Sequence, residues 1–488
     1  MQHVNHVTAR HDLTLELVRK VAWEREPLAL SSAAKRKIAA RRATFERLLA
    51  EKTEHGVYGV NQGQGEMIRY RLSDEQLLKL ARLKPYAAAT SFGELYPERV
   101  TRAMVLARLA NIIEGHAFST LRLAEALVDL LNHGPMPEVA ATGQGGAGEI
   151  LCTYPLYAAL ASKLELEPGE RSTLINGSSC AAALLADAAL ASRRRLGVVE
   201  EVLALAIEAF NAPREHYDPA LGQLWGGRHH EAAFNRLNAL LGPTARKQRD
   251  HQGPVSYRIV PAVLANGYWA LAQAEENANL AIGAVTHNPT YFEPDAAHPL
   301  GRAASTGGFH QALAAPLMDG LAAVWADLCL LSERLCCGLL NGRASGYPDF
   351  LDTRGPGETD GHGALGYLPM ALAGFVEEAR GHAQRTFIPA VDASVFGQDD
   401  VGAPAFLAWP KVVKAGETLD RALSVLAVTA SQALHLNRRD DLSPPLRKLL
   451  TEVRSVVPPL VEDRVLGPEL KALSQRFTAR VYDAAGPA

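Results

Sequence analysis

A glycine-rich loop between residues 143 and 148 is the first stretch of this sequence whose composition could serve chemistry. Four of its six residues are glycine, and an apolar run begins shortly after it. Glycine lets the backbone adopt positive φ and lets other groups approach closely, so such a turn before a helix can cradle a phosphate. However, no β-branched strand precedes the loop, and no Gly-Lys-Ser/Thr follows it. The spacing alone therefore leaves a ligand site and a plain structural loop equally open.

One other segment carries polar side chains that could act on a ligand. The glycines within residues 56–65 exclude a regular element there, so Tyr58 and Asn61 are expected on a loop. The alternative is a surface turn in which the tyrosine only packs.

Composition restricts the class of protein that holds these loops. The chain has 488 residues, of which 48% are hydrophobic, and a net charge of −3, so we expect two to four domains and neither a nucleic acid nor an anionic membrane as partner. The polar N-terminus and the lack of long apolar runs predict no signal peptide and no transmembrane helix. The five cysteines lack the spacing of a metal site, so we expect reduced thiols, no metal and a cytoplasmic location.

Helical patterns surround the loops. Ser73 and Gln76 form a capping box that opens a helix through Leu83, and Pro97 opens another over residues 98–114. Residues 1–55 indicate one or two helices, and residues 151–164 a further one. The basic triplet at 193–195 is interpreted as the solvated end of a helix.

Beyond residue 196 the pattern is almost wholly that of long helices. One apolar stripe with spacings of three and four residues consists of Met318, Leu321, Trp325, Leu328 and Leu331. Few segments alternate with period two, so little sheet is expected. We therefore predict a mainly α protein with a central bundle of long helices, divided into a domain of residues 1–210 that bears the site loops and a bundle domain of residues 211–488.

Several short motifs, in order along the chain, resemble loops of the aromatic amino acid ammonia-lyase and aminomutase family. They are Val57-Tyr58-Gly59-Val60-Asn61, Leu174-Ile175-Asn176-Gly177, the segment from Gln252 to Val263, His287-Asn288-Pro289, the segment from Ser305 to His310, and Gln398-Asp399-Asp400. The resemblance implies the helical fold of ammonia-lyases, which is like that of fumarase and aspartase. It also implies a homotetramer in which each pocket is built from three chains.

The resemblance assigns roles to particular residues. It implies that Tyr58 is the general base, that Arg258 binds the substrate carboxylate, and that Asn176 and Asp399 lie near the substrate amine. The residues expected to line the substrate pocket are Asn61, Ala88, Gln252, Val255, Phe309 and Gln398.

This chain departs from the family pattern at three of its site positions. Val255 stands where the family has tyrosine, Gly308 where it has asparagine, and Asp399 where it usually has glutamate. Ala87 and Ala88 match the family position that tunes the choice of substrate ring, so the resemblance implies an open, apolar pocket end that disfavours a histidine-like substrate.

The largest departure lies in the glycine-rich loop. In the family an Ala-Ser-Gly tripeptide there cyclises into an electrophilic methylidene-imidazolone (MIO) group. The matching residues here are Gly146, Ala147 and Gly148, so the serine is missing, and Gly148 has no side chain to dehydrate. We therefore expect no MIO group at this position and no other cofactor. A ring at Ala141-Thr142-Gly143 is an alternative, and Ala344-Ser345-Gly346 is a weaker one because it matches a distant turn.

Three functions follow from these observations. The first is a lyase of this family that acts on the carbon–nitrogen bond of a small aromatic or conjugated amino or carboxylic acid. The second is an MIO-free enzyme for amine–acyl condensation or other carbon–nitrogen chemistry in a specialised biosynthetic pathway. The third is a non-catalytic binding subunit. The sequence leaves the exact substrate, the reaction direction and the pathway open.

Overall fold

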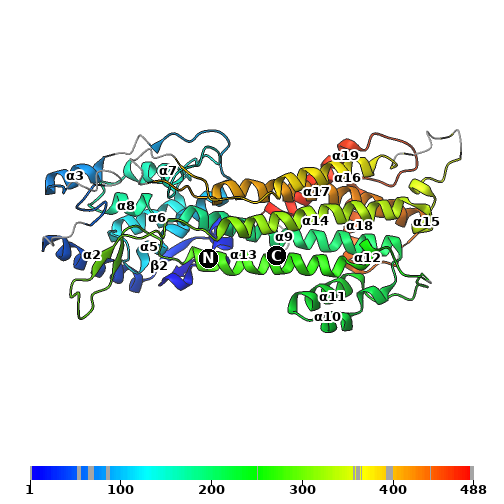
Figure 1. Ribbon diagram of the computed structural model, residues 1–488, viewed down its shortest axis with the longest axis horizontal. Helices are drawn as coiled ribbons and strands as arrows, with labels where there is room; N and C mark the ends of the chain where they lie inside the picture. Colours follow the sequence, from blue (N-terminus) through cyan, green and yellow to red (C-terminus); the bar gives the residue numbers. More distant parts are fainter. Residues whose placement is uncertain are drawn as a thin grey trace. The chain divides into compact units, whose positions relative to one another are not determined.

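The computed structural model describes residues 3–51, 57–63, 71–83, 88–249, 251–355, 358, 363, 365–391, 399–439 and 441–483. Helices dominate these residues, with two short two-stranded sheets among them (Figure 1). The chain forms two compact units: unit 1 comprises residues 1–190, 274–317 and 386–409, and unit 2 comprises residues 191–273, 318–385 and 410–488. Each unit is thus assembled from three separate segments, unlike the contiguous domains expected at 1–210 and 211–488.

Short elements make up most of unit 1. They are β1 (Asn5–Val7), α1 (Leu15–Val18), β2 (Leu28–Leu30), α2 (Ser32–Ala50), α3 (Asp74–Arg82), α4 (Glu98–Arg108), α5 (Ala110–Ile113), α6 (Leu121–His133), α7 (Ile150–Ala161), α8 (Glu170–Ile175), β3 (Thr290–Phe292) and β4 (Arg302–Ala304). Strands β1 and β2 pair in parallel, and β3 and β4 pair antiparallel.

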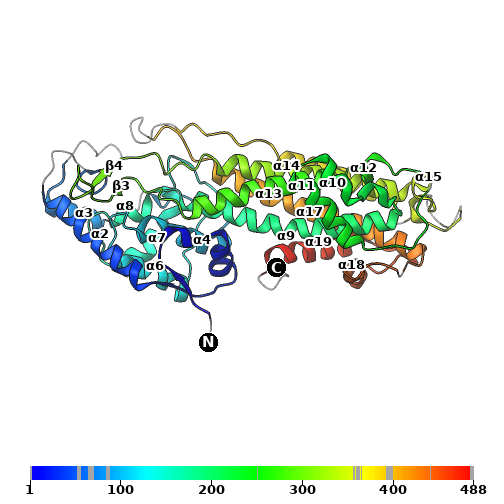
Figure 2. The same ribbon diagram turned by 90° about the horizontal axis from the view of Figure 1, so that it is seen from below.

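Unit 2 contains a second set of helices. They are α10 (Pro219–Trp225), α11 (Arg228–Leu241), α12 (Val255–Arg258), α15 (Gly342–Ser345), α16 (Leu368–His382), α18 (Pro444–Val456) and α19 (Gly467–Tyr482). Four longer helices begin in one unit and end in the other: α9 (Ser179–Phe210), α13 (Val260–Ile282), α14 (Ala314–Leu340) and α17 (Ala405–Leu436). Within unit 2, the portions of these helices run side by side in both views (Figures 1 and 2), which confirms the expected bundle.

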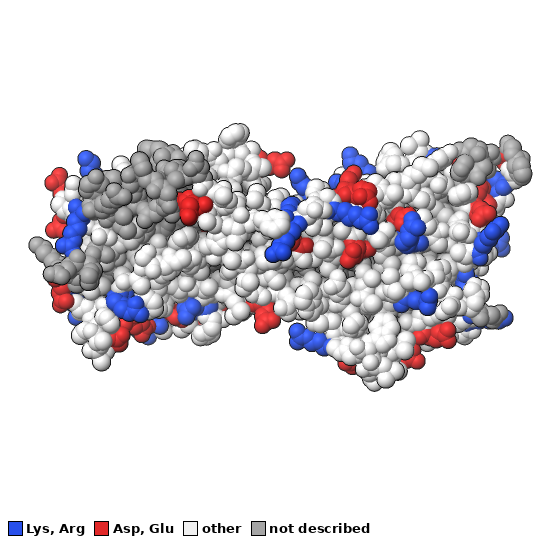
Figure 3. Space-filling model, in the orientation of Figure 1, with Lys and Arg blue, Asp and Glu red and all other residues white. Residues whose placement is uncertain are grey.

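The apolar stripe of α14 packs as predicted. Met318, Leu321, Trp325 and Leu328 have no exposed surface, and Leu331 has 4%. The helical span Glu170–Phe210, which covers α8 and α9, and helix α14 are long and apolar enough to cross a membrane by composition. However, 94% and 61% of their most apolar windows are buried within the structure. Such burial is the ordinary property of a core helix. On the face shown in Figure 3, acidic and basic side chains are interspersed.

Local signals located several helix starts correctly. Ser73 caps α3 with both hydrogen bonds of the capping box, as expected. Pro97 precedes α4, although that helix ends at Arg108 and α5 follows it, where one continuous helix was expected.

Two sequence expectations about local structure are wrong. Residues 1–55 were expected to contain helices alone, yet β1 and β2 pair there, and the Asn132 side chain bonds both Leu28 N (2.9 Å) and Leu28 O (2.8 Å). Strands of three residues are too short to show an alternating pattern. The triplet at 193–195 does not end α9, which continues to Phe210.

Arg195 lies in the interior of unit 2. Its guanidinium makes a two-pronged ion pair with Asp420 at 2.9 and 3.0 Å, and both side chains are almost completely buried. Thr478 donates a further hydrogen bond to Asp420, at 2.9 Å. The partner carboxylate lies on α17, more than two hundred residues away, so no local pattern could reveal it.

Candidate functional site

Residues 139–142, which lead into the glycine-rich loop, are held against residues 92–96. Ala141 N donates to Glu94 O at 2.7 Å, and Tyr96 N donates to Val139 O at 2.9 Å. The hydroxyl of Thr142 donates to Phe92 O at 2.6 Å. The backbone and side chain of Ala141-Thr142 are therefore engaged in fixed contacts.

The second half of the loop requires glycine. Gly146 and Gly148 have φ of 93° and 66°, a region that other residues rarely adopt. The carbonyl of Gly146 accepts a hydrogen bond from Ala403 N at 3.1 Å. A Cβ atom added to Gly148 would lie 3.8 Å from the ring of Phe309, which is ordinary contact. The structure thus brings the loop together with Phe309 and with the segment that follows Asp399.

Asp399 lies just before that segment. Val391 N donates to Asp400 O at 3.0 Å, and Gly402 N donates to Pro389 O at 2.8 Å, so residues 399–402 run antiparallel to residues 389–391. Asp399 is half-buried, and burial, followed by the charge of Asp400, raises the pKa of its carboxyl group. Gln398 lies outside the described residues.

Sequence reasoning missed Glu149, which directly follows the loop. Its side chain is buried and accepts hydrogen bonds from the backbone N–H groups of Cys180 and Ala181, each at 2.6 Å. These N–H groups belong to the first turn of α9, where a carboxylate is favoured. Burial nevertheless raises the pKa of Glu149 to about 7. The available signal was an acidic residue between a glycine-rich turn and an apolar helix.

Asn176 is the C-cap of α8 and joins two distant segments. Its side-chain amide donates to Ser172 Oγ and to Asn288 O, both at 2.9 Å. Because these bonds use both amide hydrogens, the side-chain oxygen is the part of the amide that can accept a hydrogen bond from a ligand. Arg108, fully buried, donates to the backbone carbonyls of Asn176 and Thr173.

Gly177, the next residue, has no room for a side chain. Its φ is 111°, and an added Cβ atom would lie 3.1 Å from both an Arg108 nitrogen and the Thr286 hydroxyl. The Asn-Gly pair is therefore fixed on one side by α8 and on the other by residues 286–288.

Residues 286–288 are held by side-chain amides. Asn111 Oδ1 accepts from Thr286 N at 2.8 Å and His287 N at 3.1 Å, and Asn288 Oδ1 accepts from Thr306 N at 2.9 Å. The Asn288–Pro289 peptide bond is cis. His287 is completely buried, which lowers its pKa to about 3, so the imidazole is neutral near pH 7. We interpret His287 as a structural residue.

The loop that carries Tyr58 is anchored by its apolar neighbours. Val57 and Val60 belong to a buried cluster with Phe45, Phe118 and Tyr291, whereas Tyr58 is half-buried. Val57 N donates to Asn61 Oδ1 at 2.5 Å, so the Asn61 side chain closes its own turn. This contact gives Asn61 a structural role beside the ligand contact that we expected. Ala88 is half-buried, and Ala87 lies outside the described residues.

The remaining site residues belong to unit 2. Arg258 ends α12 and is half-buried, and its buried Nε has no hydrogen-bond partner among the described residues. Val255 is 58% exposed, and Gln252 is also exposed. Tyr257 points into the core, where its hydroxyl donates to Leu335 O at 2.9 Å. Its side chain is therefore no replacement for the family tyrosine at position 255.

The helical bundle and these loops define the class of protein, and comparison with known proteins names the family. The model of the aromatic amino acid lyase family matches residues 13–162 and 153–455. The chain belongs to this family and is an enzyme of the carbon–nitrogen lyase class.

Similarity to individual proteins extends over nearly the whole chain. Histidine ammonia-lyase of Geobacillus thermodenitrificans is 28% identical, over 96% of each chain. In fold, the chain is similar to ergothionase, an ergothioneine-degrading enzyme from Treponema denticola, with a TM-score of 0.88, 18% identity, and coverage of 98% of this chain and 99% of that one. Phenylalanine aminomutase of Pantoea agglomerans gives a TM-score of 0.86 at 20% identity, over 97% and 99% of the two chains.

Proposed function

We propose that this enzyme eliminates a nitrogen group from a small aromatic or conjugated amino acid without a self-formed MIO group. The observation that carries the proposal is the composition of the loop at residues 146–148. Neither Ala147 nor Gly148 has a hydroxyl group to lose as water. The residues present therefore do not fit the prosthetic group, and the positive φ of Gly146 and Gly148 disfavours any other residue at those two positions.

The contacts of the upstream alternative also favour an unmodified loop. Cyclisation at Ala141-Thr142-Gly143 would require the backbone to leave its pairing with Glu94 and the Thr142 hydroxyl to leave Phe92 O. In Ala344-Ser345-Gly346, the carbonyl groups of Ala344 and Ser345 accept hydrogen bonds from Arg249, and the segment forms the end of α15 with Gly346 as its C-cap. Both tripeptides thus already make hydrogen bonds that cyclisation would break.

An unmodified site limits the substrate. Enzymes lower reaction barriers by roughly 8–23 kcal/mol, whereas general acid–base catalysis contributes about 10²–10⁴-fold in rate, or roughly 3–5 kcal/mol. Because no electrophile supplies the remainder, the substrate itself must be activated. Its β-proton is acidified by a conjugated ring, or its nitrogen is permanently charged, as in a quaternary ammonium group.

The roles that we propose for the side chains follow from their chemistry. Tyr58 removes the β-proton, Arg258 binds the carboxylate, and the Asn176 side-chain oxygen and Asp399 face the cationic nitrogen. The buried Nε of Arg258, which has no partner among the described residues, supports a bound anion because an unpaired buried donor is costly. The half-buried Asp399 supports a cationic partner, because a nearby positive charge offsets the effect of burial on its carboxylate.

The covalent part of the proposal is tested by intact mass. We expect the purified chain to have the mass of its sequence, apart from ordinary processing of the first methionine, and no absorbance shoulder beside the tyrosine and tryptophan band. A mass lower by two water molecules, located by peptide mapping within residues 141–149, would refute an unmodified loop.

The catalytic part is tested with a panel of substrates. The panel contains free phenylalanine, tyrosine and histidine, the trimethylammonium forms of these amino acids, and ergothioneine, the compound that the ergothionase of similar fold degrades. We expect release of a conjugated product from one of the activated compounds and none from the three free amino acids. Efficient release of ammonia from free phenylalanine, tyrosine or histidine would contradict the proposal.

The altered residues at positions 255 and 308 also suit the second function, amine–acyl condensation. Val255 replaces a family tyrosine and is exposed, and Gly308 is packed against Thr286, with 3.2 Å between an added Cβ atom and the Thr286 backbone. Incubation with a thioester and an amine distinguishes this function from elimination, since only condensation forms an amide. A non-catalytic binding subunit would show ligand affinity that is unchanged by Tyr58→Phe and no turnover of any compound.

We further propose that the enzyme is a cytoplasmic homotetramer. Exposed large apolar side chains along α13 and α16, such as Trp269 (55%), Leu280 (67%) and Met370 (71%), support burial by further copies of the chain. Light scattering during size-exclusion chromatography would give the mass of the assembly, and a monomer at micromolar concentration would refute the tetramer.

A further inference from the structure

A cavity of about 630 Å³ in unit 2 is lined by four basic side chains, Arg246, Arg249, His251 and Arg343. Tyr347 and Asn437 add polar groups to the wall, and none of the described lining residues is acidic. The volume lies in the range of sites for small molecules. Three guanidinium groups around one cavity suit an anionic ligand.

Arg249 is fixed in place. Its guanidinium lies 4.0 Å above the centre of the Phe210 ring and donates to Phe210 O at 2.9 Å. It also donates to the carbonyl oxygens of Ala344 and Ser345. Because these acceptors are neutral, they orient the guanidinium and leave its charge uncompensated.

Arg246 has an unsatisfied group at the same cavity. Its Nη1 atom is buried and has no hydrogen-bond partner among the described residues. None of Arg246, His251 and Arg343 takes part in an ion pair within the described part of the chain. Asp441, which interacts with Arg246 at longer range, is itself paired with Arg439.

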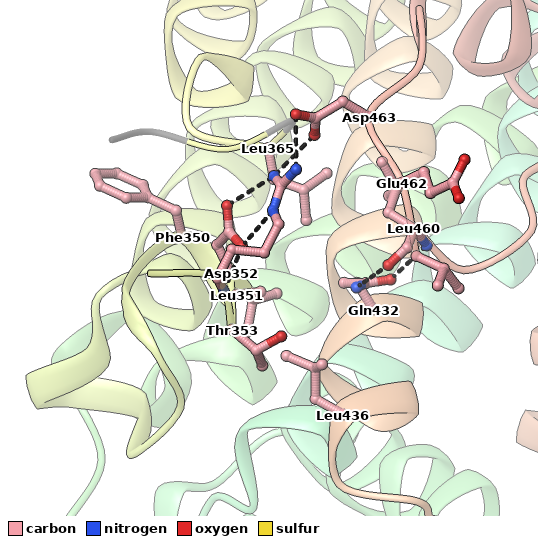
Figure 4. A pocket seen from close by; sticks show the side chains of 12 residues that line it. Phe350, Leu351, Asp352, Thr353, Leu365, Gln432, Leu436, Leu460, Glu462 and Asp463 are labelled. Atoms are coloured by element: carbon pink, nitrogen blue, oxygen red, sulfur yellow. Dashed lines mark hydrogen bonds and ion pairs between the residues drawn. The ribbon is translucent and has the colours of Figure 1, made fainter. Parts of the chain in front are cut away.

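In an adjacent cavity, by contrast, carboxylate side chains of the protein neutralise the charge of an arginine. This second cavity shares Thr353 and Leu436 with the first (Figure 4). There, Arg354 donates to Asp352 at 2.8 and 2.9 Å and to Asp463 at 2.8 and 2.9 Å. The basic cavity has no such carboxylate pair among the described residues, and its basic side chains suit a ligand that carries negative charge.

We propose that the cavity bounded by Arg246, Arg249, His251 and Arg343 binds the phosphate group of a small molecule. A phosphate has oxygen atoms in several directions and a charge near −2, so it can accept from several guanidinium forks at once. The site is independent of the proposed elimination, because it uses none of the residues assigned to that reaction.

The experiment measures binding of inorganic phosphate and of pyrophosphate to the full-length enzyme by isothermal titration calorimetry, in a phosphate-free buffer of constant ionic strength. We expect binding of one ligand per chain. Arg246→Gln should weaken it by roughly 10- to 100-fold, the effect of one lost charge-assisted hydrogen bond. Arg343→Gln serves as a second variant, and Arg476→Gln is the matched control, because Arg476 lies outside the cavity lining and donates to Ser455 on the surface.

The thermal stability of the variants gives a second measurement, and it distinguishes an arginine that binds phosphate from one that only stabilises the fold. Since Arg246 Nη1 lacks a partner, Arg246→Gln should unfold no more easily than the wild type without phosphate. Phosphate should then raise the melting temperature of the wild type and of Arg476→Gln, and less that of Arg246→Gln.

Several results would overturn the proposal. One is the absence of binding of either probe at about 10 mM, and another is equal binding by the wild type and both cavity variants. A third is tighter binding of citrate than of pyrophosphate, which would indicate that the ligand is a polycarboxylate. Binding to vesicles that contain phosphatidic acid, without binding of free phosphate or pyrophosphate, would place the anion on a membrane and refute a small-molecule site. Unfolding of Arg246→Gln in the absence of ligand would assign the residue to the core.

Discussion

Replacing Glu149 tests whether a single buried carboxylate holds the glycine-rich loop to the start of α9. The two hydrogen bonds at 2.6 Å from Cys180 N and Ala181 N join positions 31 and 32 residues away along the chain. Glu149→Ala would remove both acceptors and leave two buried N–H groups unpaired. Each unpaired group costs about 1–3 kcal/mol, so the free energy of unfolding should fall by roughly 2–6 kcal/mol.

A second variant separates the loss of hydrogen bonds from the loss of volume. Glu149→Gln keeps the size of the side chain and one carbonyl acceptor, so one N–H group remains paired. We expect a loss of about 1–3 kcal/mol, between the wild type and Glu149→Ala. Both variants should also reduce turnover, because the loop at 146–148 and the Asn176–Gly177 turn lie on the two sides of this contact.

The ionisation of Glu149 gives a dependence on pH with a definite sign. Burial raises its pKa from 4.5 to about 7 in the folded chain. Between these two values the unfolded chain has released the proton and the folded chain still holds it, so stability falls as pH rises, by up to ~1.4 kcal/mol per pH unit. The side chain in Glu149→Gln does not titrate, and its stability should lack this component.

The assay is chemical denaturation of the full-length enzyme at pH values from about 4.5 to 8, followed by circular dichroism. The difference in unfolding free energy between the wild type and Glu149→Gln should shrink as pH rises to about 7 and then level off. Parallel pH profiles for the two proteins would refute the raised pKa. A Glu149→Ala variant within about 0.5 kcal/mol of the wild type would show that the two hydrogen bonds do not hold the loop.

Three further predictions concern the core, the proposed base and the turn after Asn176. Asp420→Ala leaves the buried Arg195 guanidinium without its carboxylate and should lower the free energy of unfolding in denaturant by about 3–5 kcal/mol. The double variant Arg195→Met/Asp420→Leu should lower it less. Equal losses for the two proteins would argue against a coupled pair. On an accepted elimination substrate, Tyr58→Phe should lower kcat by about 10²–10⁴-fold with little change in substrate affinity, and unchanged kcat would exclude the tyrosine as the base. Gly177→Ala should lower the free energy of unfolding by about 1–3 kcal/mol, because Gly177 has a positive φ and close neighbours. The control Gly197→Ala lies in open space on a helix and should not lower it. Comparable melting temperatures for the two variants would contradict this prediction.

The order and spacing of residues along the chain determined the fold class and the family of this protein. The capping box at Ser73, the apolar stripe of α14 and the series of loop motifs each depend on residues close together in sequence, which is why helices, the mainly α fold and the family could be predicted. The lack of a hydroxyl group at residues 146–148 is likewise a property of covalent structure, which no folding can change.

Tertiary structure decided the pairings that these patterns do not contain. The sequence pattern predicted Arg195 at a solvated helix end, but in the structure it pairs with Asp420 on α17. Glu149 accepts its hydrogen bonds because the first turn of α9 lies against it. Asn176 reaches a carbonyl 112 residues away. A side chain's neighbours at such separations depend on which helix faces meet. The sequence therefore specifies which groups are available, whereas the packing of the helices determines which of them are buried together and how they are charged.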